Sequence, residues 1–191
     1  DFAGIHSEEV TFDSNGTNVA AYTSRPAQAL GKLPIIIVAS EIFGVHEHIK
    51  DVCRRFAKLG YLAIAPELYA RQGDAATYTD ISKLMAEVVS KVSDAQVLAD
   101  LDGAVDWAVH NGGNPHKIGI TGFCWGGRIV YMFAAHNPNV RAAVAWYGMT
   151  AKPFVPGDNP KADAAKIFKL YQALFKLAAA YSRKGMKSAE E

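Results

Sequence analysis

The stretch that decides the fold is IGITGFCWGGR, residues 118–128. The isoleucines before Gly122 predict a buried strand, and the residues from Trp125 onward have the spacing of a helix. The pattern Gly-x-Cys-x-Gly between them is typical of a nucleophile elbow, a sharp turn that needs small neighbours. The N-terminus of the following helix favours the thiolate form of Cys124. This stretch therefore predicts that Cys124 is a nucleophile at the end of a sheet strand.

A free cysteine is more often a small buried apolar residue than a nucleophile. The strand and helix patterns that flank Cys124 argue against that alternative there, whereas Cys53 has the spacing of a core residue in a predicted helix. Two cysteines in such places do not form a disulfide framework, which favours a reducing compartment. We therefore expect a cytoplasmic protein.

Strand and helix patterns alternate on both sides of the elbow. Short β-branched runs suit strands that are buried on both faces, and longer segments carry apolar residues at three- and four-residue spacing. Such alternation implies an α/β fold with a mostly parallel sheet, preceded by an N-terminal hairpin. The predicted strands are 8–13, 18–24, 35–39, 61–65, 117–121 and 140–147, and the predicted helices are 46–59, 80–91, 94–110 and 125–136.

Candidate catalytic groups follow predicted strands, at the edge where parallel sheets place their sites. Glu41 comes soon after the strand at 35–39 and could accept the thiol proton, or it could be a surface or helix-capping acid. The backbone N–H groups of Ile42 and Trp125 are the candidates for an oxyanion hole.

Candidate substrate contacts come from the same edge. Arg71 could pair with a substrate carboxylate, although an exposed loop arginine fits the pattern equally well. Tyr69 lies beside it, and the side chain of Trp125, next to the thiol, is expected to line the pocket. Arg128, on the first turn of the nucleophile helix, is left open between a substrate contact and a surface role.

The composition limits the classes of function. The chain has 191 residues, half of them hydrophobic, and a net charge of +1. One domain with a sizeable core is expected, without affinity for nucleic acid or an anionic membrane. No apolar run approaches the roughly 18 to 20 residues of a membrane span. His46 and His48 do not share a helix face, so no metal or cofactor is expected.

The C-terminal residues differ in character from the rest. Residues 151–191 carry eight basic and four acidic side chains, whereas acids are in excess before them. Residues 152–160 hold three prolines, and 163–182 carry apolar residues at helical spacing with lysines between them. We expect a core domain at 1–148, followed at 149–191 by a loop and an amphipathic basic helix.

The sequence resembles the dienelactone hydrolase family, the carboxymethylenebutenolidases. The resemblance covers about residues 5–148 and rests on four motifs in the family's order, which are far more specific together than the elbow alone. It implies an α/β-hydrolase fold, a three-layer sandwich around a mostly parallel sheet. The motifs are IIVASEIFGV at 36–45, GYLAIAPELY at 60–69, GFCWGGR at 122–128 and AVAWYG at 143–148.

The resemblance also implies a reaction, the hydrolysis of small lactones or carboxylic esters. In the family, the glutamate that matches Glu41 contacts the resting thiol and takes its proton when substrate binds. The thiolate of Cys124 would then attack the lactone carbonyl, and the acyl-enzyme would be hydrolysed with a histidine and an aspartate completing the triad. We expect a small-molecule substrate and a monomer or homodimer.

The sequence departs from the family where that histidine and aspartate should lie. The family's aspartate follows a seventh strand and its histidine a later loop, and neither segment is found after Gly148. His136 lies at the far end of the helix that starts beside Cys124, about 16 Å away, which excludes it as the triad base. Asp158 follows a glycine but no predicted strand.

Three explanations of this departure stay open. The sequence is incomplete or wrongly assigned beyond about residue 148, which we favour, or a C-terminal helix replaces the last strands, or a partner chain completes the site. A second functional hypothesis follows: a catalytically impaired hydrolase-fold binding protein that uses its basic helix. Thiol redox chemistry at Cys124 ranks last, because no resolving cysteine is close in sequence.

Overall fold

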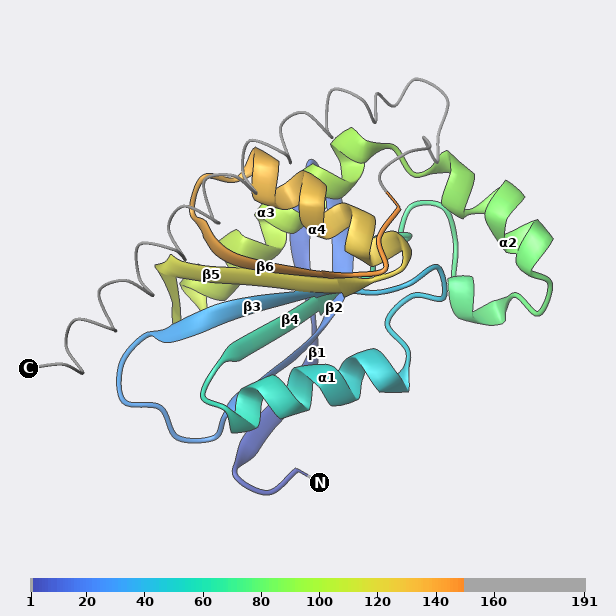
Figure 1. Cartoon of the computed structure of the whole chain (residues 1–191). Coiled ribbons are helices and arrows are strands. Elements are labelled where there is room, and N and C mark those ends of the chain that lie inside the picture. Colours follow the sequence, from blue (N-terminus) through green and yellow to red (C-terminus); the bar gives the residue numbers. More distant parts are fainter. Residues whose placement is uncertain (1, 150–191) are drawn as a thin grey trace, which may run out of the picture.

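The structure, a computed structural model, describes residues 2–149. The loop and basic helix expected at 149–191 lie outside the described residues from residue 150 onward. The explanation in which a helix replaces the last strands concerns the same undescribed residues. Six strands form one sheet in the order β1-β2-β4-β3-β5-β6 (Figure 1). They are β1 (Ile5–Ser14), β2 (Thr17–Pro26), β3 (Leu33–Ala39), β4 (Leu62–Pro66), β5 (Gly113–Phe123) and β6 (Val140–Trp146).

The N-terminal hairpin is antiparallel and the rest of the sheet is parallel. β1 pairs with β2 and β2 with β4 in antiparallel fashion, whereas β4, β3, β5 and β6 run parallel to one another. The prediction of a mostly parallel sheet is therefore confirmed. Because parallel strands end at the same edge, the segments after Ala39, Pro66, Phe123 and Trp146 gather there.

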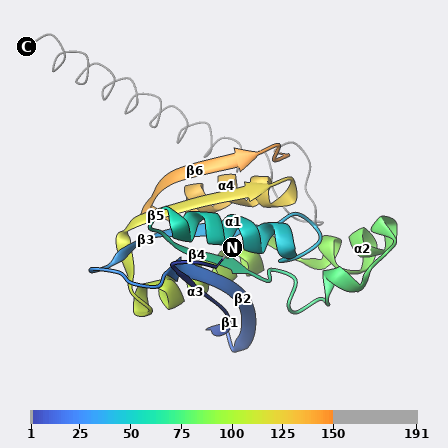
Figure 2. The same cartoon turned by 90° about the horizontal axis from the view of Figure 1, so that it is seen from below.

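Helices cover both faces of the sheet and complete the three-layer sandwich expected from the resemblance. α1 (Glu47–Lys58) packs on one face, and α3 (Asp94–His110) and α4 (Trp125–His136) pack on the other (Figure 1). The short α2 (Ile81–Glu87) stands apart from the strands (Figure 2). Cys53 lies in the smaller apolar cluster under α1, where burial raises the pKa of its thiol to about 12. Its predicted core role is confirmed.

The helix predicted over residues 80–91 was wrong in its second half. α2 ends at Glu87, Val88 departs from helical geometry at φ −119° and ψ −69°, and a 3₁₀ turn (Val89–Lys91) follows. Val88 and Val89 are both fully buried. Both valines pack in the main apolar cluster of the protein.

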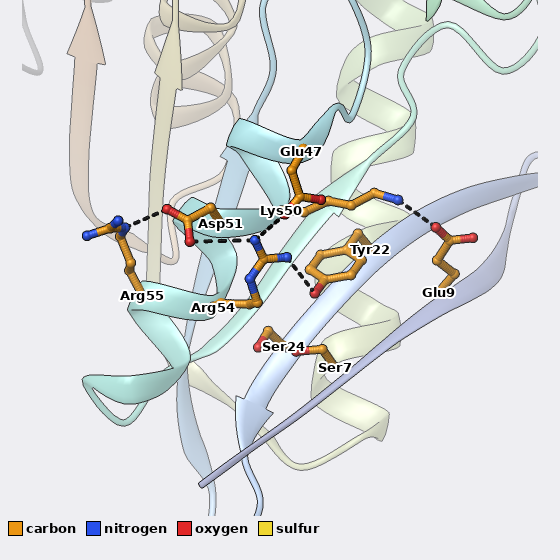
Figure 3. A network of polar contacts seen from close by, with 9 residues as sticks. All are labelled: Ser7, Glu9, Tyr22, Ser24, Glu47, Lys50, Asp51, Arg54 and Arg55. Carbon is orange, nitrogen blue, oxygen red and sulfur yellow. Dashed lines mark hydrogen bonds and ion pairs between the residues drawn. The ribbon is translucent and has the colours of Figure 1, made fainter. Parts of the chain in front are cut away.

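A polar network fixes α1 against the hairpin, as Figure 3 shows. The guanidinium of Arg54, 7% exposed, donates to the Tyr22 hydroxyl at 3.3 Å and pairs with Glu47 at 2.5 Å. Lys50 pairs with Glu9 of β1 at 2.6 Å. These contacts hold the N-terminal half of α1, and with it the loop that joins β3 to α1 at the sheet edge.

Candidate active site

Cys124 occupies a strained turn between β5 and α4. Its φ of 54° and ψ of −114° lie in a region that non-glycine residues rarely adopt. The turn is held by neighbouring backbone, because the Cys124 N–H donates to the Trp146 carbonyl at 2.9 Å and its own carbonyl accepts from the Arg128 N–H at 3.2 Å. A side chain kept in such a conformation by its surroundings is a mark of functional sites.

Glycines beside Cys124 allow β3, β5 and α4 to meet. A Cβ at Gly126 would collide with the backbone carbonyl oxygens of Ala39 and Ser40, and one at Gly122 would lie 2.5 Å from the Gly126 oxygen. The Gly-x-Cys-x-Gly pattern is therefore a packing requirement of this turn. It brings the end of β3, which carries the Glu41 loop, against the first turn of α4.

The loop after β3 carries Glu41, and its carboxylate pairs with a histidine. Oε2 of Glu41 lies 3.0 Å from Nε2 of His46, and the two side chains are 17% and 35% exposed. Glu67 braces the same loop by accepting the Val45 N–H at 2.8 Å. Burial raises the pKa of the Glu67 carboxyl. Gly44 lies in the same loop with φ 74°, a backbone conformation that favours glycine.

Tyr69 and Trp125 form a buried aromatic wall beside these groups. Their ring centroids are 5.0 Å apart, and the Tyr69 hydroxyl donates to the Glu41 carbonyl at 3.5 Å. Burial raises the pKa of Tyr69 well above its usual value, and negative charge on Cys124, Glu67 and Glu41 raises it further. Tyr69 therefore contacts both the Glu41 backbone and Trp125, the residue that follows Cys124.

Tyr147 borders the same site from the end of β6. Its φ is 43°, its side chain is 69% exposed, and desolvation followed by the charges of Glu41 and Cys124 raises its pKa. Sequence reasoning missed this residue, and it considered His46 as a metal ligand or as a residue with a capping role at a helix start. The position of Tyr147 at the carboxyl end of a parallel strand was the available signal.

The two predicted arginines have partners within the fold. Arg71 Nη1 lies 2.7 Å from Oδ2 of the fully buried Asp100, and its Nη2 donates to the Ser14 carbonyl at 2.9 Å. Arg128 makes a two-pronged contact with Asp94 at 2.6 and 2.7 Å. These bonds tie loop and helix segments together, and a contact of Arg71 with substrate stays a prediction.

Both candidate oxyanion donors belong to segments at the sheet edge. Trp125 is the first residue of α4, where an amide has no carbonyl partner within its own helix. Ile42 lies in the turn that directly follows Glu41. Their roles as donors to an oxyanion stay predictions, as do the catalytic roles of Cys124 and Glu41.

Two other features have no direct contact with Cys124 or Glu41. His136 pairs with Asp102 at 2.7 Å at the end of α4 opposite Cys124. A cavity of about 440 Å³ beside Tyr22 and Lys50 adjoins the Glu41 loop through Val45 and Glu67, but its lining includes neither Cys124 nor Glu41. Between residues 2 and 149 there is no cluster of three potential metal ligands, and no helix has the length and apolar character needed to cross a membrane.

Comparisons with known proteins agree on one family. The model of the dienelactone hydrolase family matches residues 19–178. A "Putative carboxymethylenebutenolidase" of Yersinia pestis is 59% identical over 145 residues, which are 76% of this chain and 54% of that protein. The protein of the same name in Escherichia coli K12 is 61% identical over 135 residues, 71% of this chain and 50% of its own length. The chain thus spans about half the length of these relatives.

A solved structure agrees with the same assignment. The crystal structure titled "Putative Dienelactone Hydrolase", from Klebsiella pneumoniae, superimposes with a TM-score of 0.78 and 47% identity. The match covers 88% of this chain and 81% of that chain.

Proposed function

Since this chain belongs to the dienelactone hydrolase family, we propose that it hydrolyses small lactones or carboxylic esters through the thiol of Cys124. The observation that carries the proposal is the strained turn at Cys124, with φ 54°, next to Trp125, whose ring packs on the same Tyr69 that donates to the Glu41 carbonyl. A fold holds a cysteine in such a conformation at a cost, and that cost is typical of a functional position.

In the proposed acylation step, the Glu41 carboxylate takes the proton of the Cys124 thiol. The thiolate sulfur attacks the carbonyl carbon of the substrate, and the backbone N–H groups of Ile42 and Trp125 donate to the oxygen that becomes negative. The ring or ester C–O bond then breaks, the leaving oxygen takes the proton that Glu41 had accepted, and a thioester on Cys124 remains. Water hydrolyses the thioester, which releases the carboxylic acid and restores the thiol.

The predicted substrate contacts differ in how much surface they offer. Tyr69 and Trp125 are both nearly fully buried in the main apolar cluster, so they expose almost no surface to a substrate, and their contact with substrate stays a prediction. Tyr147, which is largely exposed, would border the opening. Arg71 is the predicted partner of a substrate carboxylate, in competition with its bonds to Asp100 and Ser14.

The decisive experiment detects the acyl-enzyme directly and does not depend on turnover. The protein is incubated with an enol-lactone and with p-nitrophenyl acetate, and intact-mass and peptide-mass spectrometry locate the added acyl group. We expect one acyl group on Cys124, no adduct in Cys124→Ala, and an unchanged adduct in Cys53→Ala, because Cys53 is fully buried. Acylation at another residue, or none in a folded protein, would refute the proposal and favour the binding-protein hypothesis.

A further inference from the structure

His46 is the described residue whose side chain pairs with the carboxylate of Glu41. The contact joins Nε2 of His46 to Oε2 of Glu41 at 3.0 Å, and with the proton on Nε2 the imidazole donates to the carboxylate. The backbone of this loop is fixed independently by Glu67, which accepts the Val45 N–H. His46 therefore determines where the Glu41 side chain points and leaves the loop backbone to other contacts.

We propose that His46 is a positioning residue that orients the Glu41 carboxylate and offsets its charge, so that more of Cys124 is thiolate at neutral pH. The inference rests on the proposed roles of Cys124 and Glu41. A free carboxylate near a thiol disfavours the thiolate, because like charges repel. A donor on Oε2 weakens that repulsion and keeps the carboxylate in the site, where it can accept the thiol proton.

The His46 side chain pairs with Glu41 and stacks on His48, with the ring centroids 6.2 Å apart. His46 precedes α1 at the N-cap position, yet its side chain makes no capping hydrogen bond. The first turn of α1 uses the His46 carbonyl, which accepts the Lys50 N–H at 3.1 Å and is present in every residue type. Substitution of the His46 side chain should therefore leave the helix in place.

Several other titratable groups lie near the His46–Glu41 pair, and the test variants leave all of them unsubstituted. They come from the segment after β4, from the end of β6, from the elbow and from the start of α1. Desolvation raises the pKa of both tyrosines among them, so both remain neutral near pH 7. The groups are Glu67, Tyr69, Tyr147, Cys124 and His48.

The test is the rate of Cys124 alkylation by iodoacetamide as a function of pH, read by peptide mass. His46→Leu removes the donor, and we expect a rate about fivefold lower near neutral pH, with the profile moved to higher pH. His46→Gln keeps an amide N–H that can reach Oε2 of Glu41, and we expect it to recover most of the rate. Cys53 is fully buried, so we expect iodoacetamide not to alkylate it in the folded protein.

Two control variants test whether the change in alkylation rate comes from the His46–Glu41 contact itself. His136→Leu removes a similar histidine–carboxylate contact, the 2.7 Å pair with Asp102, at the opposite end of α4, and should leave the alkylation profile unchanged. In a Glu41→Gln background, His46→Leu should have no further effect, because His46 acts through the carboxylate.

Three outcomes would overturn the proposal. They are a wild-type profile in His46→Leu, an equally slow His46→Gln, and an undiminished effect of His46→Leu in the Glu41→Gln background. The proposed function fails separately, through an acyl adduct that does not depend on Cys124. Alkylation requires no substrate, so the effect of His46 on the thiol is measured in either case.

Discussion

Replacing Arg71 by methionine should strongly destabilise the protein, because Asp100 would lose its charged partner. The Asp100 side chain is fully buried, Oδ2 bonds to Arg71, and Oδ1 has no hydrogen-bond partner within the described residues. The variant would therefore leave a buried carboxyl group with neither oxygen paired. The substitution also distinguishes two roles of Arg71, a structural ion pair with Asp100 and a contact with a substrate carboxylate.

The size of the effect follows from the burial of the pair. Removing one partner of a buried ion pair costs about 3 to 5 kcal/mol. Arg71 is itself 22% exposed in its side chain, so water can reach the vacated space and the lower end, about 3 kcal/mol, applies. With a urea slope of about 2 kcal/mol per molar, the midpoint of unfolding should fall by about 1.5 M.

The assay is urea unfolding followed by circular dichroism, with two companion variants. Arg71→Met combined with Asp100→Leu replaces the pair by apolar groups and should recover most of the loss. Arg55→Met is the matched control, since Arg55 pairs with Asp51 at 2.6 Å but is 77% exposed, and it should change stability by less than about 0.5 kcal/mol. A loss below about 1 kcal/mol in Arg71→Met, with a raised KM, would refute the structural assignment and support substrate contact.

Two further predictions concern the elbow and its support. Gly126→Ala should cost at least about 3 kcal/mol in urea unfolding, because its Cβ would collide with the rigid carbonyls of Ala39 and Ser40; an unchanged midpoint would contradict this packing. Burial raises the pKa of Glu67, so its protonated form is favoured in the folded state and its contribution to stability is lost as pH rises through that raised pKa. The free energy of unfolding of the wild type, relative to that of Glu67→Gln, should therefore decrease as the pH rises from acid to neutral. A difference that does not change with pH would contradict this prediction.

Local patterns in the sequence were sufficient for most of the fold. The elbow at Cys124, the strand before it and the helix after it depend on glycines and apolar spacing over a few residues, and the structure confirms those elements. The alternation of strands and helices likewise indicated a mostly parallel sheet. Such features are encoded over short stretches, because backbone geometry and the direction of burial are set locally.

The break after Glu87 could not be predicted, because its cause is tertiary. The periodicity of residues 80–91 fits a helix when taken alone. Only the structure shows that the backbone departs from helical geometry at Val88, where Val88 and Val89 both pack in the main apolar cluster. Burial against distant segments overrides local propensity in such cases.

For the site, the sequence by itself determined which chemistry is at hand: a cysteine in an elbow, a glutamate after a parallel strand and an aromatic beside the thiol. Only the tertiary structure decided the partners. It pairs Glu41 with His46, directs Arg71 to Asp100, residues far apart in the chain, and brings Tyr147 to the edge. The physical reason is that side-chain hydrogen bonds and ion pairs depend on distances of about 3 Å in space, which residue spacing along the chain does not specify.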